Sequence, residues 1–167
     1  RYFSSAASDV YKRQRKYLSN EDELKDVTDD LCVFGLFGPK SRALIKTLSK
    51  DNFDNDKFKF GTAKNILIDG INIWAQRLSY VGELGYELYV ELKDVKKIYE
   101  LIISKGKDFN LSNCGMHAMD IMRMESGFLH WGHDISPEEN QYQAGLSFTT
   151  VSYTHLTLPT RSAVGVW

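Results

Sequence analysis

Cysteine is scarce in this sequence: Cys32 and Cys114 are the two among 167 residues. They show no metal-ligand spacing, so we expect reduced thiols, a cytoplasm-like compartment and no metal site. No apolar run approaches the ~20 residues that a membrane-spanning helix needs, and no secretory signal opens the chain. The formal net charge of −1 argues against a nucleic-acid binder, which usually carries a basic patch. The sequence therefore predicts a cytoplasmic protein that binds neither membranes nor nucleic acid.

The chain does contain enough apolar material for a folded core. Apolar residues make up 43% and charged residues 26%, a balance typical of globular rather than disordered proteins. The length suits one ordinary domain or a slice of a larger protein. We find no internal repeat and no low-complexity linker that would divide the sequence further.

The two ends differ in character from the middle. One strand of a single oligonucleotide can encode residues 4–14, and the opposite strand, read in a shifted frame, encodes 151–160. We therefore expect 1–14 and 151–167 to be translated adapter, and 15–150 to be a domain fragment truncated at both sides. These flanks should add nothing to the main core.

Hydrophobic patterning predicts an α+β fold with antiparallel or mixed sheets and packed helices. The hairpin signal is Asp69-Gly70 between β-branched runs, and its second strand should continue to Tyr80. Gly106 is expected to stop the helix before it. The expected elements are a buried strand at 32–37, a helix at 40–49, a polar loop at 50–57, a hairpin over 65–74, a strand at 86–90, and helices at 94–104 and 116–125.

Glu87 interrupts the apolar run 86–90. Strand alternation puts Glu87 and Tyr89 on one face and the other three side chains on the opposite face. A buried carboxylate without partners is costly. Glu87 therefore either faces water on an edge strand or meets a ligand with N–H donors, beside an aromatic wall from Tyr80. A carboxylate can accept two parallel hydrogen bonds, so such a cup suits a flat heterocycle.

Arg123 has two interpretations, and both stay open. Asp120 lies three residues earlier on the expected helix, so the two side chains can form an ion pair. A guanidinium can also bind the carboxylate tail of an anionic substrate. Glu83, between Gly82 and Gly85, is explained more simply as part of a tight loop than as a ligand contact.

Zinc would be suggested by the set Cys114, His117, His130 and His133. No pair in this set has the close spacing of a known metal motif, so we expect no metal ion there. A cysteine nucleophile at Cys114 has no better support.

Five blocks occur in order along the chain: FGPKSR at 37–42, RLSYVGELGYELY at 77–89, MRME at 122–125, WGHD at 131–134 and AGLSF at 144–148. Together they resemble the aminomethyltransferase (glycine-cleavage T-protein) family. The nearer resemblance is to the folate-binding C-terminal part of dimethylglycine and sarcosine dehydrogenases. The match covers nearly all of 27–150, and it implies the aminomethyltransferase folate-binding fold.

The resemblance implies a tetrahydrofolate site. Tyr80 and Glu87 would flank and read the pterin, with Glu87 accepting hydrogen bonds from its N–H groups. Leu88 and Tyr89 would line the same pocket, and Phe148 would add an aromatic wall. The family's catalytic aspartate lies further upstream than this chain begins, so no residue here is given a catalytic role.

The resemblance also implies the reaction. A flavin domain of the same chain, holding FAD, would oxidise a methylated amine, and tetrahydrofolate would capture the one-carbon unit. No dinucleotide fingerprint occurs in 1–167, so the flavin belongs to a missing upstream domain. One alternative is a glycine-cleavage T-protein, although T-proteins carry arginine where this chain has Met119. Another is a non-catalytic, folate-binding or regulatory relative.

Overall fold

The computed structural model describes residues 27–149, which form two compact units, 27–128 and 129–149. The flanks expected to be adapter lie outside the described residues, so their assignment stays a prediction. The smaller unit contains η3 (Ser147–Thr149). The larger unit contains, in chain order, β1 (Leu31–Phe37), α2 (Ser41–Leu48), β2 (Ala63–Ile68), β3 (Ile71–Gln76), β4 (Gly85–Glu91), η1 (Leu92–Asp94), α3 (Val95–Gly106), η2 (Lys107–Phe109) and α4 (Met116–Glu125).

The four strands described in the larger unit form one antiparallel sheet in the order β1-β4-β3-β2. β2 and β3 are joined by the predicted hairpin. Asp69 and Gly70 have φ values of 48° and 80°, the left-handed pair that a two-residue hairpin turn requires. The α+β class expected from the pattern is confirmed.

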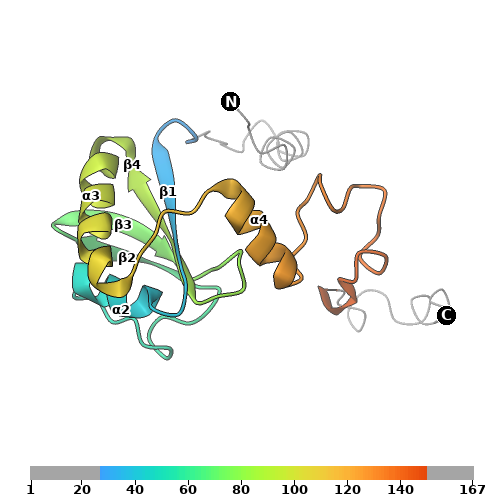
Figure 1. Ribbon diagram of the computed structural model, residues 1–167, viewed down its shortest axis with the longest axis horizontal. Coiled ribbons are helices and arrows are strands. Elements are labelled where there is room, and N and C mark those ends of the chain that lie inside the picture. Colours follow the sequence, from blue (N-terminus) through green and yellow to red (C-terminus); the bar gives the residue numbers. More distant parts are fainter. Residues whose placement is uncertain (1–26, 150–167) are drawn as a thin grey trace, which may run out of the picture. The chain divides into compact units, whose positions relative to one another are not determined.

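One face of this sheet carries the hydrophobic core. α2 and α3 lie against it (Figure 1), and their apolar residues pack onto every second residue of the strands. On β4, the residues of this face are Tyr86, Leu88 and Val90, and all three are fully buried. Their burial explains the apolar pattern of this strand. The buried residues of the strands and helices are Leu36, Leu44, Ile45, Leu48, Ile66, Ile68, Ile73, Ala75, Tyr86, Leu88, Val90, Ile98 and Ile102.

The stretch after α2 contributes to the core more than its polar composition suggests. Phe53 and Phe58 are buried, and both rings pack against Tyr86 at centroid distances of 5.8 and 5.7 Å. Main-chain turns hold the segment: the Phe58 N–H donates to the Asp54 carbonyl at 2.8 Å. The polar loop at 50–57 is thus a structured cap over one end of the core.

Three sequence expectations need correction. β1 is an edge strand and Leu36 is its one buried residue, so the expectation of a buried strand is wrong. β3 ends at Gln76, which leaves Tyr80 in an irregular segment rather than at a strand end. α3 ends at Gly106, two residues later than expected, but Gly106 keeps a right-handed φ of −65°, and η2 follows before the chain turns at Asn110 with φ 59°.

The need for glycine at residue 106 is instead a close approach. A Cβ atom there would lie 2.3 Å from Leu111 Cδ2.

No helix within 27–149 is long and apolar enough to cross a membrane. The cytoplasmic location stays a prediction.

Candidate functional site

A cavity of about 510 Å³ runs beside the edge strand β1 in the larger unit. Its walls come from β1, β4, α3, α4 and the segments that precede β4 and α4. α4 lies on the opposite side of β1 from α2 (Figure 1). The residues that line the cavity are Val33, Phe34, Gly35, Leu36, Phe37, Tyr80, Val81, Glu87, Tyr99, Ile102, Ile103, Leu111, Ser112, Asn113, Cys114, Met119 and Met122.

Glu87 is the one carboxylate among these lining residues. It lies in the middle of β4, opposite Gly35 of β1 and Gln76 of β3, on the face away from the core. Its side chain is partly buried. Tyr89, two residues further on the same face, donates a hydrogen bond from its hydroxyl to Glu87 Oε2 at 3.0 Å.

This hydrogen bond affects Tyr89 as well. Burial, followed by the hydrogen bond to the Glu87 carboxylate and its charge, raises the pKa of the Tyr89 hydroxyl above its ordinary value. The Tyr89 ring also packs on Trp74 of β3, with centroids 4.6 Å apart. Tyr89 therefore holds Glu87 in place from the side and is itself held by the next strand.

The wall beside Glu87 depends on two glycines. A Cβ at Gly35 would lie 2.6 Å from the Phe37 ring, and one at Gly85 would lie 2.4 Å from it. The Phe37 ring consequently lies across both residues, at the cavity wall next to Glu87. With a side chain at either position, the ring could not occupy this part of the wall.

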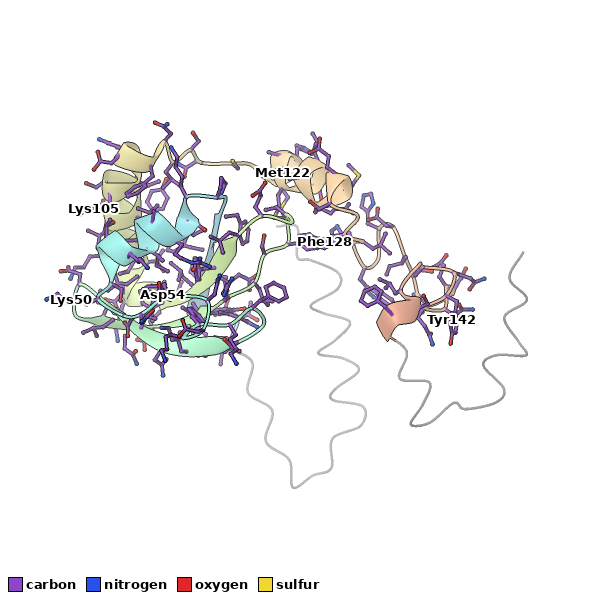
Figure 2. All side chains as sticks on the ribbon, turned by 90° about the horizontal axis from the view of Figure 1, so that it is seen from below. Lys50, Asp54, Lys105, Met122, Phe128 and Tyr142 are labelled. Atoms are coloured by element: carbon purple, nitrogen blue, oxygen red, sulfur yellow. The ribbon has the colours of Figure 1, made fainter. Side chains whose placement is uncertain are left out.

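Tyr80 lines the same cavity as Glu87. Its ring stacks on that of Phe128, with centroids 6.4 Å apart and planes 17° from parallel. Phe128 follows the C-terminal end of α4 (Figure 2). The structure thus places in one cavity the two residues that the sequence paired.

The other predicted site residues lie elsewhere. Leu88 is 0% exposed, on the core face of β4, so the cavity gives no support to a side-chain contact with a ligand. Arg123 is 2% exposed and pairs with Asp120, its Nε lying 3.2 Å from Oδ1. Phe148 is 82% exposed and belongs to the smaller unit. Their roles in folate binding stay predictions.

The far end of the cavity contains residues that sequence reasoning missed. Tyr99 of α3 accepts a hydrogen bond from Asn113 Nδ2 at 2.7 Å, and both line the cavity. Met119 and Met122 of α4 add soft apolar surface. Tyr99, the one aromatic residue of α3, was the local signal that pointed there.

The described part of the chain contains no cluster of candidate metal ligands. No three His, Cys, Asp or Glu side chains in 27–149 come together in a way that could hold a metal ion. Glu83 is exposed in a loop where Gly82 has φ 75°, which agrees with its interpretation as part of a turn.

Comparison with known proteins shows to which family the chain belongs. The model of the family described as "GCVT N-terminal domain" matches residues 2–153. The chain belongs to this family. Human mitochondrial dimethylglycine dehydrogenase is 36% identical over 126 residues, covering 75% of this chain and 14% of that protein. An aminomethyltransferase of Symbiobacterium thermophilum is 33% identical over 137 residues, covering 81% and 36%.

The fold has a counterpart among solved structures. The heterotetrameric sarcosine oxidase from Corynebacterium sp. U-96, in complex with pyrrole 2-carboxylate, matches with a TM-score of 0.54 and 13% identity, covering 64% of this chain and 54% of that chain. At this identity the likeness concerns the fold alone. The family resemblance predicted from the five sequence blocks is confirmed, and the chain is a GCVT-type domain related to these dehydrogenases and aminomethyltransferases.

Proposed function

We propose that the larger unit binds tetrahydrofolate, and that it serves one-carbon transfer from an N-methyl amine in an enzyme of the dimethylglycine and sarcosine dehydrogenase type. The observation that carries the proposal is the cavity that Glu87 and Tyr80 both line. The family membership supports the chemistry, because both of the relatives named above contain this domain type.

The carboxylate suits the edge of a pterin. A pterin presents adjacent N–H donors in its ring plane, and a carboxylate accepts such a pair with two parallel hydrogen bonds. Tyr89 already donates to one oxygen of Glu87, Oε2. Each carboxylate oxygen has two lone pairs, so Glu87 keeps acceptor capacity on both oxygens while its orientation is fixed.

The walls suit the faces of the same heterocycle. Tyr80 offers an aromatic ring, and most of the other lining residues are apolar. A volume of about 510 Å³ lies within the range of small-molecule sites. Tetrahydrofolate, when bound, supplies the nitrogen atoms that accept the one-carbon unit, whereas residues of this chain bind the pterin, orient it and exclude water.

Met119 favours the dehydrogenase type over a glycine-cleavage T-protein. It lines the cavity, at the position where T-proteins carry arginine. A thioether offers neither a charge nor hydrogen-bond donors to an anionic group there. The oxidation of the amine is assigned, by resemblance, to a flavin domain of the same polypeptide. The human relative is several times longer than this chain, since the match spans 14% of it.

Titration of tetrahydrofolate into the chain under reducing conditions, followed by calorimetry, tests the proposal. The wild type should bind, and Glu87→Gln should weaken binding by ~1.5–3 kcal/mol, the scale of a hydrogen bond to a charged group, or roughly 10- to 100-fold in Kd. Gln keeps the shape of the side chain but presents an amide donor to the N–H groups of the pterin.

Glu83→Gln is the matched control. It makes the same chemical change four residues earlier, in an exposed loop, and should leave the Kd unchanged. Thermal unfolding of both variants shows that they fold. Equal affinities for wild type and Glu87→Gln, or no binding at all to the folded wild type, would reject the folate assignment.

A further inference from the structure

The C-terminal end of α4 is closed by a Schellman motif. Gly127 has φ 73°, and its N–H donates to the Met124 carbonyl at 2.9 Å. The Phe128 N–H donates to the Arg123 carbonyl at 2.8 Å. These two bonds reverse the chain immediately after the helix and fix the main chain at Phe128.

The Arg123 side chain adds a second hold on the same residue. Its Nη1 donates to the Phe128 carbonyl at 3.1 Å, and its Nε donates to Asp120 Oδ1 at 3.2 Å. The guanidinium is almost wholly buried, so its position is well defined. Arg123 therefore fixes both the N–H and the carbonyl of Phe128, through its own main chain and its side chain.

This end of α4 also holds the segment that carries Tyr80. The Phe128 ring stacks on Tyr80, and Ser126 Oγ donates to the Val81 carbonyl at 2.9 Å. The approach is close, because a Cβ at Gly82 would lie 2.2 Å from Ser126 Oγ. Two independent contacts thus join the helix end to consecutive residues of this segment.

We infer that the C-terminal end of α4 positions Tyr80 for its ligand, with Phe128 as the supporting ring and Arg123 as a positioning residue behind it. The inference rests on the proposed function for the identity of the ligand, and it gives Arg123 a role other than binding an anionic tail. Neither Arg123 nor Phe128 is among the residues that line the cavity.

The need for such support follows from the local structure. Residues 77–84 lie in neither a helix nor a strand, so tertiary contacts, including the stacking on Phe128, set the position of the Tyr80 ring. A ligand that ordered a loose ring would lose affinity to the conformational entropy of ordering it. Because Phe128 already holds the Tyr80 ring, a ligand that packs on this ring loses less conformational entropy on binding.

Replacement of Phe128 tests this directly. Phe128→Leu removes the ring but keeps an apolar side chain, and should raise the Kd for tetrahydrofolate about 2- to 10-fold, the range expected for a lost aromatic pair. Phe128→Tyr restores the ring and should restore the affinity. Met124→Leu, an exposed substitution on the same turn of α4, is the control and should leave the Kd unchanged.

A double-mutant cycle separates positioning from general damage. In a Tyr80→Ala background, Phe128→Leu should have no further effect on the Kd, because the ring that it supports is gone. An equal loss in both backgrounds would overturn the inference, since Phe128 would then act independently of Tyr80.

Nuclear magnetic resonance of the ligand-free chain, with labelled tyrosine, gives a readout independent of folate. Phe128→Leu and Arg123→Met should each shift the Tyr80 ring signals, while Met124→Leu should not. Unshifted Tyr80 signals in a folded Phe128→Leu chain would reject the inference. If tetrahydrofolate does not bind the wild type but these shifts occur, the proposed function fails while the positioning of Tyr80 stands.

Discussion

The Tyr89 hydroxyl donates to Glu87 Oε2 at 3.0 Å, between side chains two residues apart on the same face of β4. The bond is local in sequence, yet it depends on the whole sheet, because β1 and β3 flank the pair on either side. Glu87 is thus neither a solvated edge residue nor an unpartnered buried charge. The carboxylate has a partner and still faces a cavity.

The first prediction concerns the pKa of Tyr89. Burial and Glu87 both raise it above the ordinary 10.0. Glu87→Gln removes the charge, so the pKa should fall toward 10.0 while burial keeps part of the rise. Titration of ring-labelled tyrosine by nuclear magnetic resonance measures it, and Tyr89→Phe assigns the signal. A pKa that stays the same in Glu87→Gln would contradict the coupling.

The raised pKa of Tyr89 also determines how the stability of the chain changes at alkaline pH. Because the pKa is raised in the folded state, the unfolded chain loses the Tyr89 proton first, near pH 10.0. The stabilising contribution is complete below that pH and is lost as the pH rises through the folded-state pKa. Tyr89→Phe should therefore show a shallower fall of the free energy of unfolding above pH 10.0.

A second prediction separates core from cavity on β4. Leu88→Ala should lower the free energy of unfolding by ~2–5 kcal/mol, as expected for a large-to-small change in a packed core. Leu67→Ala is the control, because Leu67 lies in the same sheet but is 57% exposed, and it should cost far less. Urea denaturation measures both. Similar losses for the two variants would contradict the assigned faces.

A third prediction concerns the contact between Gly82 and Ser126. Gly82→Ala should destabilise the chain by at least ~1–2 kcal/mol, the cost of the left-handed conformation alone for a residue with a Cβ. The clash with Ser126 Oγ adds to this. Ser126→Gly removes the clash but also the hydrogen bond to the Val81 carbonyl, so it serves as the reference for the double variant. In the Ser126→Gly background, Gly82→Ala should cost less in thermal unfolding than in the wild type, because only the backbone strain remains. An equal cost in both backgrounds, or none in the Ser126→Gly background, would contradict this division.

A fourth prediction concerns stability at acid pH. Asp51 Oδ2 accepts hydrogen bonds from the Leu67 N–H at 3.0 Å and from Ser49 Oγ at 2.7 Å, which lower the pKa of Asp51 below 3.8. The contribution is therefore complete above pH 3.8 and is lost as the pH falls through the lowered pKa. Asp51→Asn should be less stable than wild type at neutral pH, with the gap closing below pH 3.8.

Asp56→Asn serves as its control, because Asp56 is exposed and lies in the same loop. Unfolding by urea at a series of pH values compares the three chains. A gap between Asp51→Asn and wild type that stays constant down to the lowest pH would show that Asp51 stabilises the loop by means other than its charge.

Local signals in the sequence predicted local structure well. The helix at 116–125 has the predicted bounds. The sequence signals for its two ends are local to this segment. The hairpin followed from Asp69 and Gly70, and alternation correctly separated the two faces of β4. The family resemblance could be found because its motifs are short and ordered along the chain.

Features that depend on distant residues were not predictable in the same way. Phe53 and Phe58 lie in an Asp- and Asn-rich stretch, and their burial depends on contacts with the core, including the Tyr86 ring, which is distant in the sequence. Tyr99 of α3 and Asn113, in the segment before α4, are joined at the cavity by a hydrogen bond between residues 14 positions apart. The edge position of β1 follows from the strand order, which no single segment encodes.

The glycine at residue 35 has a consequence for which ligands can enter. A single methyl group there would meet the Phe37 ring at 2.6 Å and force it to turn. Because that ring is part of the wall beside Glu87, the room next to the carboxylate would change with it. The width of the cavity at its charged end is therefore controlled by a residue without a side chain, on a strand that adds no polar side chain to the lining.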